Sequence, residues 1–292
     1  MFLLALLACT PSPVEIVDTS VPWVLPECPS FSEGEALGSL TDLELDELSG
    51  ITATTEDAGV LWAHNDSGDT ARFFAVEVSG RVRGAVRLAD TTAFDWEDIT
   101  LAREGDAAWI WLADIGDNAV ARPEVRLYRV AEPDPGALPA ELPGERFTLR
   151  YSDGPHNAET LLWDPIDRAL YILTKEDEAP SGLWRLPQPV VDGGVMERVG
   201  EVDLWSDDFA GSGLATGGEV SPDGLLLAVR TYTHVWAWRR DPARPLAEAL
   251  GSPACELPVV GERQGEALTW VGQDYLTVSE GQEAPVHRFL RR

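Results

Sequence analysis

The sequence predicts an all-β fold that is built from a repeated four-stranded unit. A short inner-strand motif recurs five times, and its aligned residue returns at intervals of 48, 62, 57 and 50 residues. Between the motifs, apolar and polar residues alternate in short segments, as they do in half-buried antiparallel strands. A repeat near this period indicates a radial or solenoid array, because one unit alone cannot bury its apolar face.

Each unit begins with the inner-strand motif. The five copies are LSGIT at 48–52, WEDIT at 96–100, AETLL at 158–162, ATGGE at 215–219 and GEALT at 265–269. Aligning the copies places one polar side chain of each unit at the same position. These five residues are Ser49, Glu97, Glu159, Thr216 and Glu266. If the units form a ring, this strand lines the central channel, so we expect the five side chains to meet there.

Three further strands are expected in most units. The second strands are predicted at 60–66, 109–115, 170–176, 226–232 and 275–281. The third strands are predicted at 72–78, 125–130, 182–186, 234–238 and 286–290. A less regular fourth strand is predicted at 81–88, 146–151, 196–204 and 255–260. Helices of any length are not evident, and only residues 246–250 could form a helical turn.

The two ends of the chain are predicted to complete one unit together. The last unit ends at Arg292 after three strands, and the segment 36–44 precedes the first unit. Pairing these ends would close a ring and remove the free sheet edges. We therefore predict a β-propeller of five four-stranded blades over residues 34–292. Six blades are the alternative, because the second and third units are long enough to hold extra strands.

The charge composition excludes some classes of partner. The 292 residues include 22 basic and 50 acidic ones, which gives a net charge of −28. Such a surface repels nucleic acid and anionic lipid headgroups and attracts cations or basic partners. Solubility alone is an equally good explanation of the charge. A hydrophobic fraction of 44% and 11 Trp residues are sufficient for a substantial core.

The N-terminus resembles that of a bacterial lipoprotein. Residues 1–9 are apolar and end in LLAC, similar to a lipobox, in which the chain is cut before the cysteine that then carries the lipid. The segment is too short to span a bilayer, which takes about 20 residues. We expect a signal peptide (1–8), a lipidated Cys9, a tether (9–33) and a location in the cell envelope, with the anchor as the membrane contact. A basic segment before the apolar run is missing, so simple secretion is an alternative.

Cys28 and Cys255 remain once Cys9 is assigned to the lipid. An even pair in an oxidising compartment predicts a disulfide bond that attaches the tether to the late part of the fold. Two free buried thiols are the alternative. Neither cysteine has the spacing of a metal ligand.

The aligned polar positions predict one acidic centre at the channel mouth. Several carboxylates in a narrow channel repel one another, so their pKa values rise or cations neutralise them. A divalent cation, with Ca²⁺ as the first choice, takes such oxygen ligands. Lys175 and Arg230 could instead neutralise them in an internal ion-pair network. The candidate metal ligands are Glu97, Glu159, Glu266 and Asp114.

Other polar residues near the same blade ends are candidates for binding and catalysis. His64 and His156 are candidate general bases, with a hydrogen-bonded turn histidine as the alternative. Lys175 and Arg230 are candidates for stabilising negative charge. The candidate ligand-binding residues are Asn65, Asp66, Asp98, Asp117, Asn118 and Asn157. The segments 65–68 and 114–118 also have the composition of tight turns.

Seven motifs spread over the chain carry a family resemblance. They are ELSGI (47–51), HNDSG (64–68), DWEDI (95–99), DIGDN (114–118) with Arg122, NAETLL (157–162), TGGEVSPDG with AVRTY (216–232), and QGEAL with TVSEG (264–281). Together they resemble a family of uncharacterised bacterial secreted propellers. More distantly, the inner strands resemble esterase-like phytase, gluconolactonase and strictosidine-synthase-like propellers. That resemblance implies a channel-mouth site, often with calcium, and in some relatives hydrolysis of esters or lactones. Those relatives generally have six blades, so only Glu97, Glu159 and Glu266 are carried over, as metal ligands.

Three functions agree with these features. The first is a lipid-anchored propeller that binds a divalent cation and a small molecule or protein ligand without turnover. The second is a metal-dependent hydrolase of a lactone, ester or phosphoester, in which the metal polarises the substrate and activates water. The third is a scaffold for protein contacts with an inert polar core. Fold alone does not decide between them.

Overall fold

The computed structural model describes residues 23–176, 180–204, 206, 208–262 and 264–292. The described part consists of strands and one short 3₁₀ helix, η1 (Leu246–Gly251). The predicted signal peptide and Cys9 lie outside the described residues, as does the predicted tether up to residue 22. No helix in this part of the chain combines the length and the apolar character that crossing a membrane requires.

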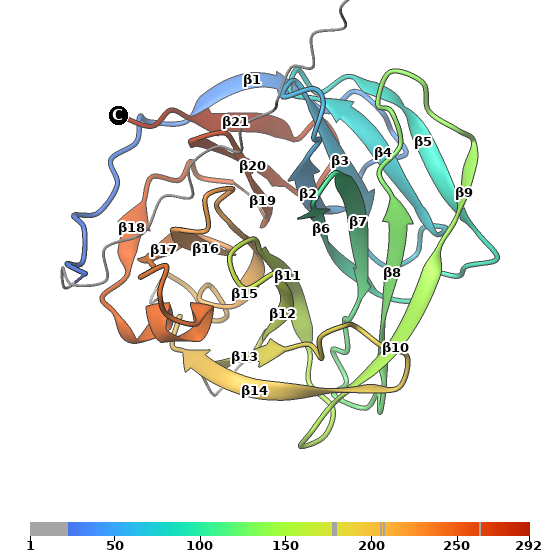
Figure 1. Ribbon diagram of the computed structural model, residues 1–292. Coiled ribbons are helices and arrows are strands. Elements are labelled where there is room, and N and C mark those ends of the chain that lie inside the picture. Colours follow the sequence, from blue (N-terminus) through green and yellow to red (C-terminus); the bar gives the residue numbers. More distant parts are fainter. Residues whose placement is uncertain (1–22, 177–179, 205, 207, 263) are drawn as a thin grey trace, which may run out of the picture.

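Most strands belong to four-stranded meanders that run outward from the middle of the molecule (Figure 1). The first meander comprises β2 (Leu48–Ala53), β3 (Val60–Asn65), β4 (Arg72–Glu77) and β5 (Val82–Ala89). The second comprises β6 (Trp96–Glu104), β7 (Ala107–Asp114), β8 (Val125–Ala131) and β10 (Glu145–Tyr151). The third comprises β11 (Ala158–Asp164), β12 (Ala169–Thr174), β13 (Ser181–Arg185) and β14 (Gly194–Val202).

The last two meanders complete the set. The fourth comprises β15 (Ala215–Val220), β16 (Leu226–Thr231), β17 (Val235–Arg239) and β18 (Cys255–Leu257). The fifth comprises β19 (Gly265–Val271), β20 (Asp274–Ser279), β21 (Pro285–Phe289) and β1 (Glu35–Ser39). Strand β1 pairs antiparallel with β21, so the two ends of the chain share one sheet. This is the pairing that the sequence predicts.

Two parallel pairings connect neighbouring meanders and were not expected from the sequence. β10 pairs with β14, which joins the second and third meanders into one eight-stranded sheet. A short strand, β9 (Glu141–Pro143), extends the first sheet by pairing with β5. Both pairings lie at the outer edges of the meanders, where each covers strand edges that would otherwise be free.

The five inner strands contact one another in a closed circle. β2 contacts β6, β6 contacts β11, β11 contacts β15, β15 contacts β19, and β19 contacts β2. The apolar core follows the same circular order. It comprises five clusters, and each cluster lies between two neighbouring meanders. Tryptophans occupy these boundaries, and Trp62 and Trp96 share one cluster. The described chain is thus all-β, and its sheets are consistent with a β-propeller.

A disulfide bond joins Cys28 to Cys255 of β18, across a sequence separation of 227 residues. Arg239 supports the same junction. Its guanidinium donates one hydrogen bond to the Pro26 carbonyl (2.6 Å) and another to the Pro253 carbonyl (2.7 Å). The segment that leads into β1 is therefore attached to the fourth meander as well as to the fifth.

We expect loss of this disulfide bond to destabilise the fold. Replacing both cysteines (Cys28→Ser with Cys255→Ser) should lower the free energy of unfolding by about 2–4 kcal/mol, because the unfolded chain loses a long covalent loop. Denaturant unfolding with and without reductant measures the effect. Reductant should destabilise the wild-type chain by the same amount and leave the double variant unchanged. An equal response of both proteins to reductant would contradict the expectation.

Candidate metal centre at the start of the inner strands

A β-bulge occurs at the start of every inner strand. In each one the pairing register with the second strand skips a single residue. The skipped residues are the aligned positions Ser49, Glu97, Glu159, Thr216 and Glu266. A bulge leaves one residue unpaired and redirects its side chain. The polar residue that recurs in the sequence is therefore the extra residue of a β-bulge in every unit.

The two hydroxyl residues in this set connect neighbouring meanders. Ser49 donates a hydrogen bond to the Glu97 carbonyl (2.6 Å), and Thr216 donates one to the Gly265 carbonyl (2.6 Å). Both acceptors lie in the next meander of the circle. These bonds hold neighbouring bulges against one another and fix the backbone at Glu97 and directly before Glu266.

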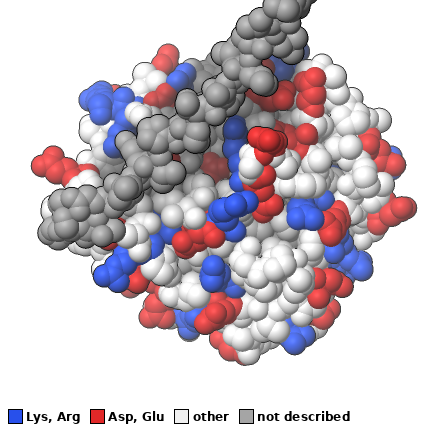
Figure 2. Space-filling model, in the orientation of Figure 1, with Lys and Arg blue, Asp and Glu red and all other residues white. Residues whose placement is uncertain are grey.

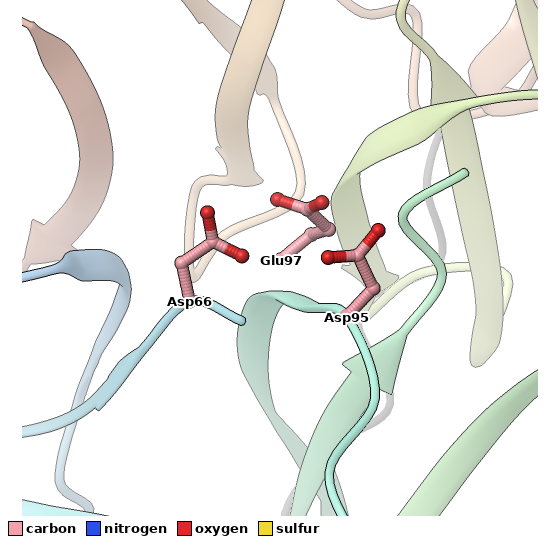
Figure 3. A group of neighbouring side chains, drawn as sticks. All are labelled: Asp66, Asp95 and Glu97. Atoms are coloured by element: carbon pink, nitrogen blue, oxygen red, sulfur yellow. The ribbon is translucent and has the colours of Figure 1, made fainter. Parts of the chain in front are cut away.

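Three carboxylates converge at this end of the channel. Asp66 follows β3, Asp95 precedes β6, and Glu97 is the bulge residue of β6. One carboxylate oxygen from each lies within 4.8 Å of the other two, and Figure 3 shows the three groups pointing toward a common space. Such a group of oxygen ligands could hold a metal ion.

The 114–118 turn approaches the acidic centre closely at Gly116. A Cβ atom at Gly116 would lie 2.0 Å from Oε1 of Glu97 and 2.5 Å from Oδ2 of Asp95. The backbone of the 114–118 turn therefore packs directly against two carboxylates. Its position is fixed by Arg122, which donates to the Gly116 carbonyl (2.6 Å) and to Oδ1 of Asp114 (2.7 Å).

Lys175 and Glu159 lie near Glu97, and Glu266 lies near Lys175 and Glu159. Lys175 donates to Oε1 of Glu159 (2.5 Å) and to the Tyr232 hydroxyl (2.9 Å). Lys175 is 10% exposed and Glu159 8% exposed, so this ion pair is shielded from solvent. Glu266 is also buried. Acidic and basic side chains are intermixed near the centre of the face drawn in Figure 2.

The electrostatics favour neutralisation of this acidic group. Burial, and then the neighbouring Glu159, raise the pKa of Glu97 well above its usual range. Burial raises the pKa of Asp95 to about 6, with Asp66 adding to the shift. Burial also raises the pKa of Glu159 to about 7, and that of Glu266 to about 9 with repulsion from Glu159. Carboxylates in this state either retain protons or bind a cation.

Asp114 has a different role from the metal ligand that the sequence predicts. Its side chain is fully buried and forms an ion pair with Arg122. Its Oδ1 also accepts a hydrogen bond from the backbone N–H of Asp95 (3.3 Å). Asp114 therefore positions Asp95 and is not part of the converging group.

Three of the candidate ligand-binding residues form one network between the second and third meanders. The backbone N–H of Asp117 donates to the Asn157 side chain (2.7 Å), whose amide donates to Asn118 (3.2 Å). Arg122 closes the network, because its backbone N–H donates to Asp117 (2.6 Å). The side chains of Asp117 and Asn157 thus hold the turn in place, and Asn118 is exposed.

Asn65 and Asp98 also have structural hydrogen bonds. The Asn65 amide donates to the Glu44 carbonyl (2.6 Å) and to Asp69 (3.0 Å). Asp98 accepts from the backbone N–H groups of Ile99 (2.8 Å) and Leu161 (2.7 Å), which ties β6 to β11. Asp66 is therefore the member of the predicted ligand-binding set that joins the acidic centre.

The two histidines do not meet at the acidic centre. His64 is fully buried, packs edge-to-face on Trp96, and has a pKa that burial lowers to about 4. Its position does not support a role as a base. His156 is partly exposed and lies between Glu176 (2.9 Å) and Asp153 (2.8 Å). Its two ion-pair partners, Glu176 and Asp153, are not members of the acidic centre.

Arg230 is a buried structural residue. It forms an ion pair with Glu262 and donates to the Ala267 carbonyl (3.3 Å). A Cβ at Gly265 would collide with the guanidinium, so β19 needs glycine at that point. Lys175 is thus the candidate cation that lies among the bulge carboxylates.

Asp95 is the site residue that sequence reasoning missed. The DWEDI motif at 95–99 contains it, but the residue precedes the predicted inner strand, and among the other repeats the aligned position is acidic only in the first, as Glu47. The available signal was local: two acidic residues flank one tryptophan at the start of an inner strand. Tyr232, the second partner of Lys175, was missed as well.

Comparison with known proteins leaves the family resemblance untested. No protein-family model matches the chain, and no curated protein is significantly similar to it. The function must therefore be argued from the site.

Proposed function

We propose that this chain is a five-bladed β-propeller that binds a divalent cation where its inner strands begin, and that the cation helps to hold a small molecule or protein ligand. Five meanders, five intervening core clusters and the pairing of β1 with β21 support the five-bladed arrangement. The convergence of Asp66, Asp95 and Glu97 is the observation that carries the function. The predicted lipid anchor would place this binding protein in the cell envelope.

Calcium is the cation that this donor set suits best. The three carboxylates come from two different meanders and are held by loops and a bulge, which gives an irregular arrangement of oxygens. Ca²⁺ accepts about six to eight oxygens in flexible geometry, whereas Mg²⁺ demands a near-ideal octahedron. Glu159 lies close enough to add to the negative potential of the centre.

We expect one tightly held calcium ion per chain, and we expect Asp95→Asn or Glu97→Gln to weaken its binding at least tenfold. Removing one ligand charge reduces the attraction for a hard cation. Elemental analysis after dialysis and calorimetric titration with CaCl₂ at pH 7.5 measure the effect. Asp106→Asn, in an exposed turn, is the matched control and should bind as the wild-type chain does. Equal binding by all four proteins, or none by the wild-type chain, would refute the proposal.

One observation keeps the hydrolase as a second candidate. Glu159 is buried, has a pKa of about 7, and lies beside the proposed cation and Lys175. A carboxylate with such a pKa suits a general base at neutral pH. In this variant of the proposal, Glu159 replaces the histidines as the base for a metal-bound water. Assays with lactones, aryl esters and phosphate esters, with and without EDTA, would separate binding from turnover.

A further inference from the structure

Two exposed apolar side chains lie beside the acidic centre. Phe94, in the loop from β5 to β6, is 62% exposed and directly precedes Asp95. Val120, in the loop from β7 to β8, is 53% exposed, and residues 118–121 around it are exposed throughout. Neither side chain belongs to the apolar clusters that form the core of the described chain. We call Phe94 and residues 118–121 the apolar tip.

Arg122 links the two parts of the apolar tip. Its guanidinium stacks on the Phe94 ring, with Cζ 4.8 Å from the ring centroid. The same guanidinium donates to the Gly116 carbonyl (2.6 Å) and to Asp114 (2.7 Å), so its position is fixed. Arg122 also follows Val120 by two residues in the same loop. The Phe94 ring is thus supported by Arg122, while most of its side chain remains open to solvent.

Val120 adopts a backbone conformation that its side chain disfavours. Its φ is 49°, in the left-handed region that β-branched residues rarely adopt. The backbone N–H of Val120 donates to the Asp117 carbonyl (2.8 Å), which closes the turn in this conformation. Because the side chain is exposed, packing within the chain does little to offset the strain. Strained residues of this kind concentrate at functional sites, so Val120 indicates a contact with another molecule.

The surface next to the apolar tip is acidic. Burial raises the pKa of Glu280, Asp66 and Asp95, and repulsion between neighbours adds to each shift. Glu47 acts on both Glu280 and Asp66, and Asp66 acts on Asp95, so the four carboxyl groups form one acidic rim. Arg122 does not offset this rim, because it already has carboxylate and carbonyl partners. A basic partner complements such a surface, whereas an acidic one is repelled.

We propose that the apolar tip and the acidic rim dock a segment of a protein partner in which basic residues alternate with large apolar ones. An apolar side chain of the partner covers Phe94 and Val120, and its Lys or Arg side chains face the carboxyl groups of the rim. Apolar anchors surrounded by complementary charge are typical of protein interfaces. This inference goes beyond the proposed cation site and does not need the ion, because bound calcium reduces the negative charge that attracts the partner.

Three short capped peptides test the charge and the apolar requirement separately. The first alternates Lys with Leu and Phe, the second has Glu in place of Lys, and the third has Ser in place of Leu and Phe. In calorimetric titrations of the full chain in EDTA, we expect the first peptide to bind at least tenfold more tightly than either of the others. The salt concentration is about 0.15 M, at which charges more than about 8 Å apart are largely screened. Adding CaCl₂ should leave this affinity unchanged or weaken it.

Three results would overturn the proposal. They are no binding of the first peptide at about 1 mM, which is weaker than about −4 kcal/mol, equal binding of either other peptide, and binding that requires calcium. A chain that binds the first peptide but no calcium would retain the docking surface and lose the cation site, so the two proposals fail separately.

Variants then locate the contact. Phe94→Ser should weaken binding of the first peptide at least fivefold. Phe209→Ser is the matched control, because Phe209 is 55% exposed in the loop from β14 to β15 at the same end of the channel, and it should bind as the wild-type chain does. Val120→Asn should weaken binding at least threefold and keep or raise the melting temperature, since Asn tolerates the left-handed conformation. Wild-type binding by Phe94→Ser or Val120→Asn, or an equal loss in Phe209→Ser, would overturn the assignment.

Discussion

A Lys175→Met chain should lose stability in the absence of calcium and should regain most of it when calcium is added. Lys175 is the ammonium group among the bulge carboxylates, and its Nζ lies 2.5 Å from Oε1 of Glu159. Although burial opposes the charged form, Glu159 and Tyr232 raise the pKa of Lys175 above its usual range. Removing one partner of a buried ion pair costs about 3–5 kcal/mol, because the other charge remains buried without compensation.

Calcium can supply the missing positive charge if the proposed centre exists. Without the ammonium, Glu97, Glu159 and Asp66 lose a compensating charge. The variant should therefore bind calcium at least tenfold more tightly than the wild-type chain, because the cation no longer competes with a neighbouring positive charge. Thermal unfolding in EDTA and in CaCl₂, together with calorimetric titration, measures both effects.

Arg240→Met is the matched control for this experiment. Arg240 also forms a buried ion pair, with Asp164 at 2.5 Å, and Asp164 ends β11 at the opposite side of the channel from the acidic centre. Its loss of stability should be similar in size and should not respond to calcium. If calcium restored neither variant, Lys175 would be a structural residue only, and calcium would not replace its charge at the three converging carboxylates.

The sequence predicts the inner ring well because the same physical requirement recurs in every unit. Each inner strand is buried and contains one unpaired residue, so the same short motif recurs in every unit. The unpaired residues therefore align in the sequence: Ser49, Glu97, Glu159, Thr216 and Glu266. The structure places all five at the equivalent bulge. The pairing of β1 with β21 was predictable for a related reason, since one unit lacked a strand and an unassigned strand preceded the first unit.

The remaining site features depend on contacts that no repeat encodes. At the acidic centre, the 114–118 turn packs with Gly116 against the carboxylates of both Asp95 and Glu97. That contact joins segments about 20 residues apart and occurs in one unit. The burial of His64 was likewise not evident from the repeat: this polar residue at a strand end lies in the core, where its ring contacts the Asn65 carbonyl (2.7 Å). The parallel pairing of β10 with β14 likewise depends on strand ends that meet only in the fold.

The metal-free chain should become less stable as the pH rises from 5.5 to 8.5. Burial raises the pKa of Glu266 from 4.5 to about 9 and that of Glu219 from 4.5 to about 7. Between the unfolded and folded values, the folded chain binds more protons than the unfolded chain, so its stability falls with increasing pH. A group in this range contributes about 1.4 kcal/mol for each pH unit. Melting temperatures measured in EDTA should therefore fall by at least about 3 °C over this range.

Calcium should reverse this trend, because the cation binds carboxylates only after their protons have left. The increase in melting temperature on adding CaCl₂ should consequently be larger at pH 8.5 than at pH 5.5. Glu266→Gln removes a bulge carboxyl group whose pKa burial raises to about 9, and it should flatten the profile in EDTA, since an amide does not titrate. Glu141→Gln, on a partly exposed strand edge, should keep the wild-type slope. A flat wild-type profile, or a slope that Glu266→Gln leaves unchanged, would contradict the raised pKa of Glu266 and remove the electrostatic argument for a cation at the start of the inner strands.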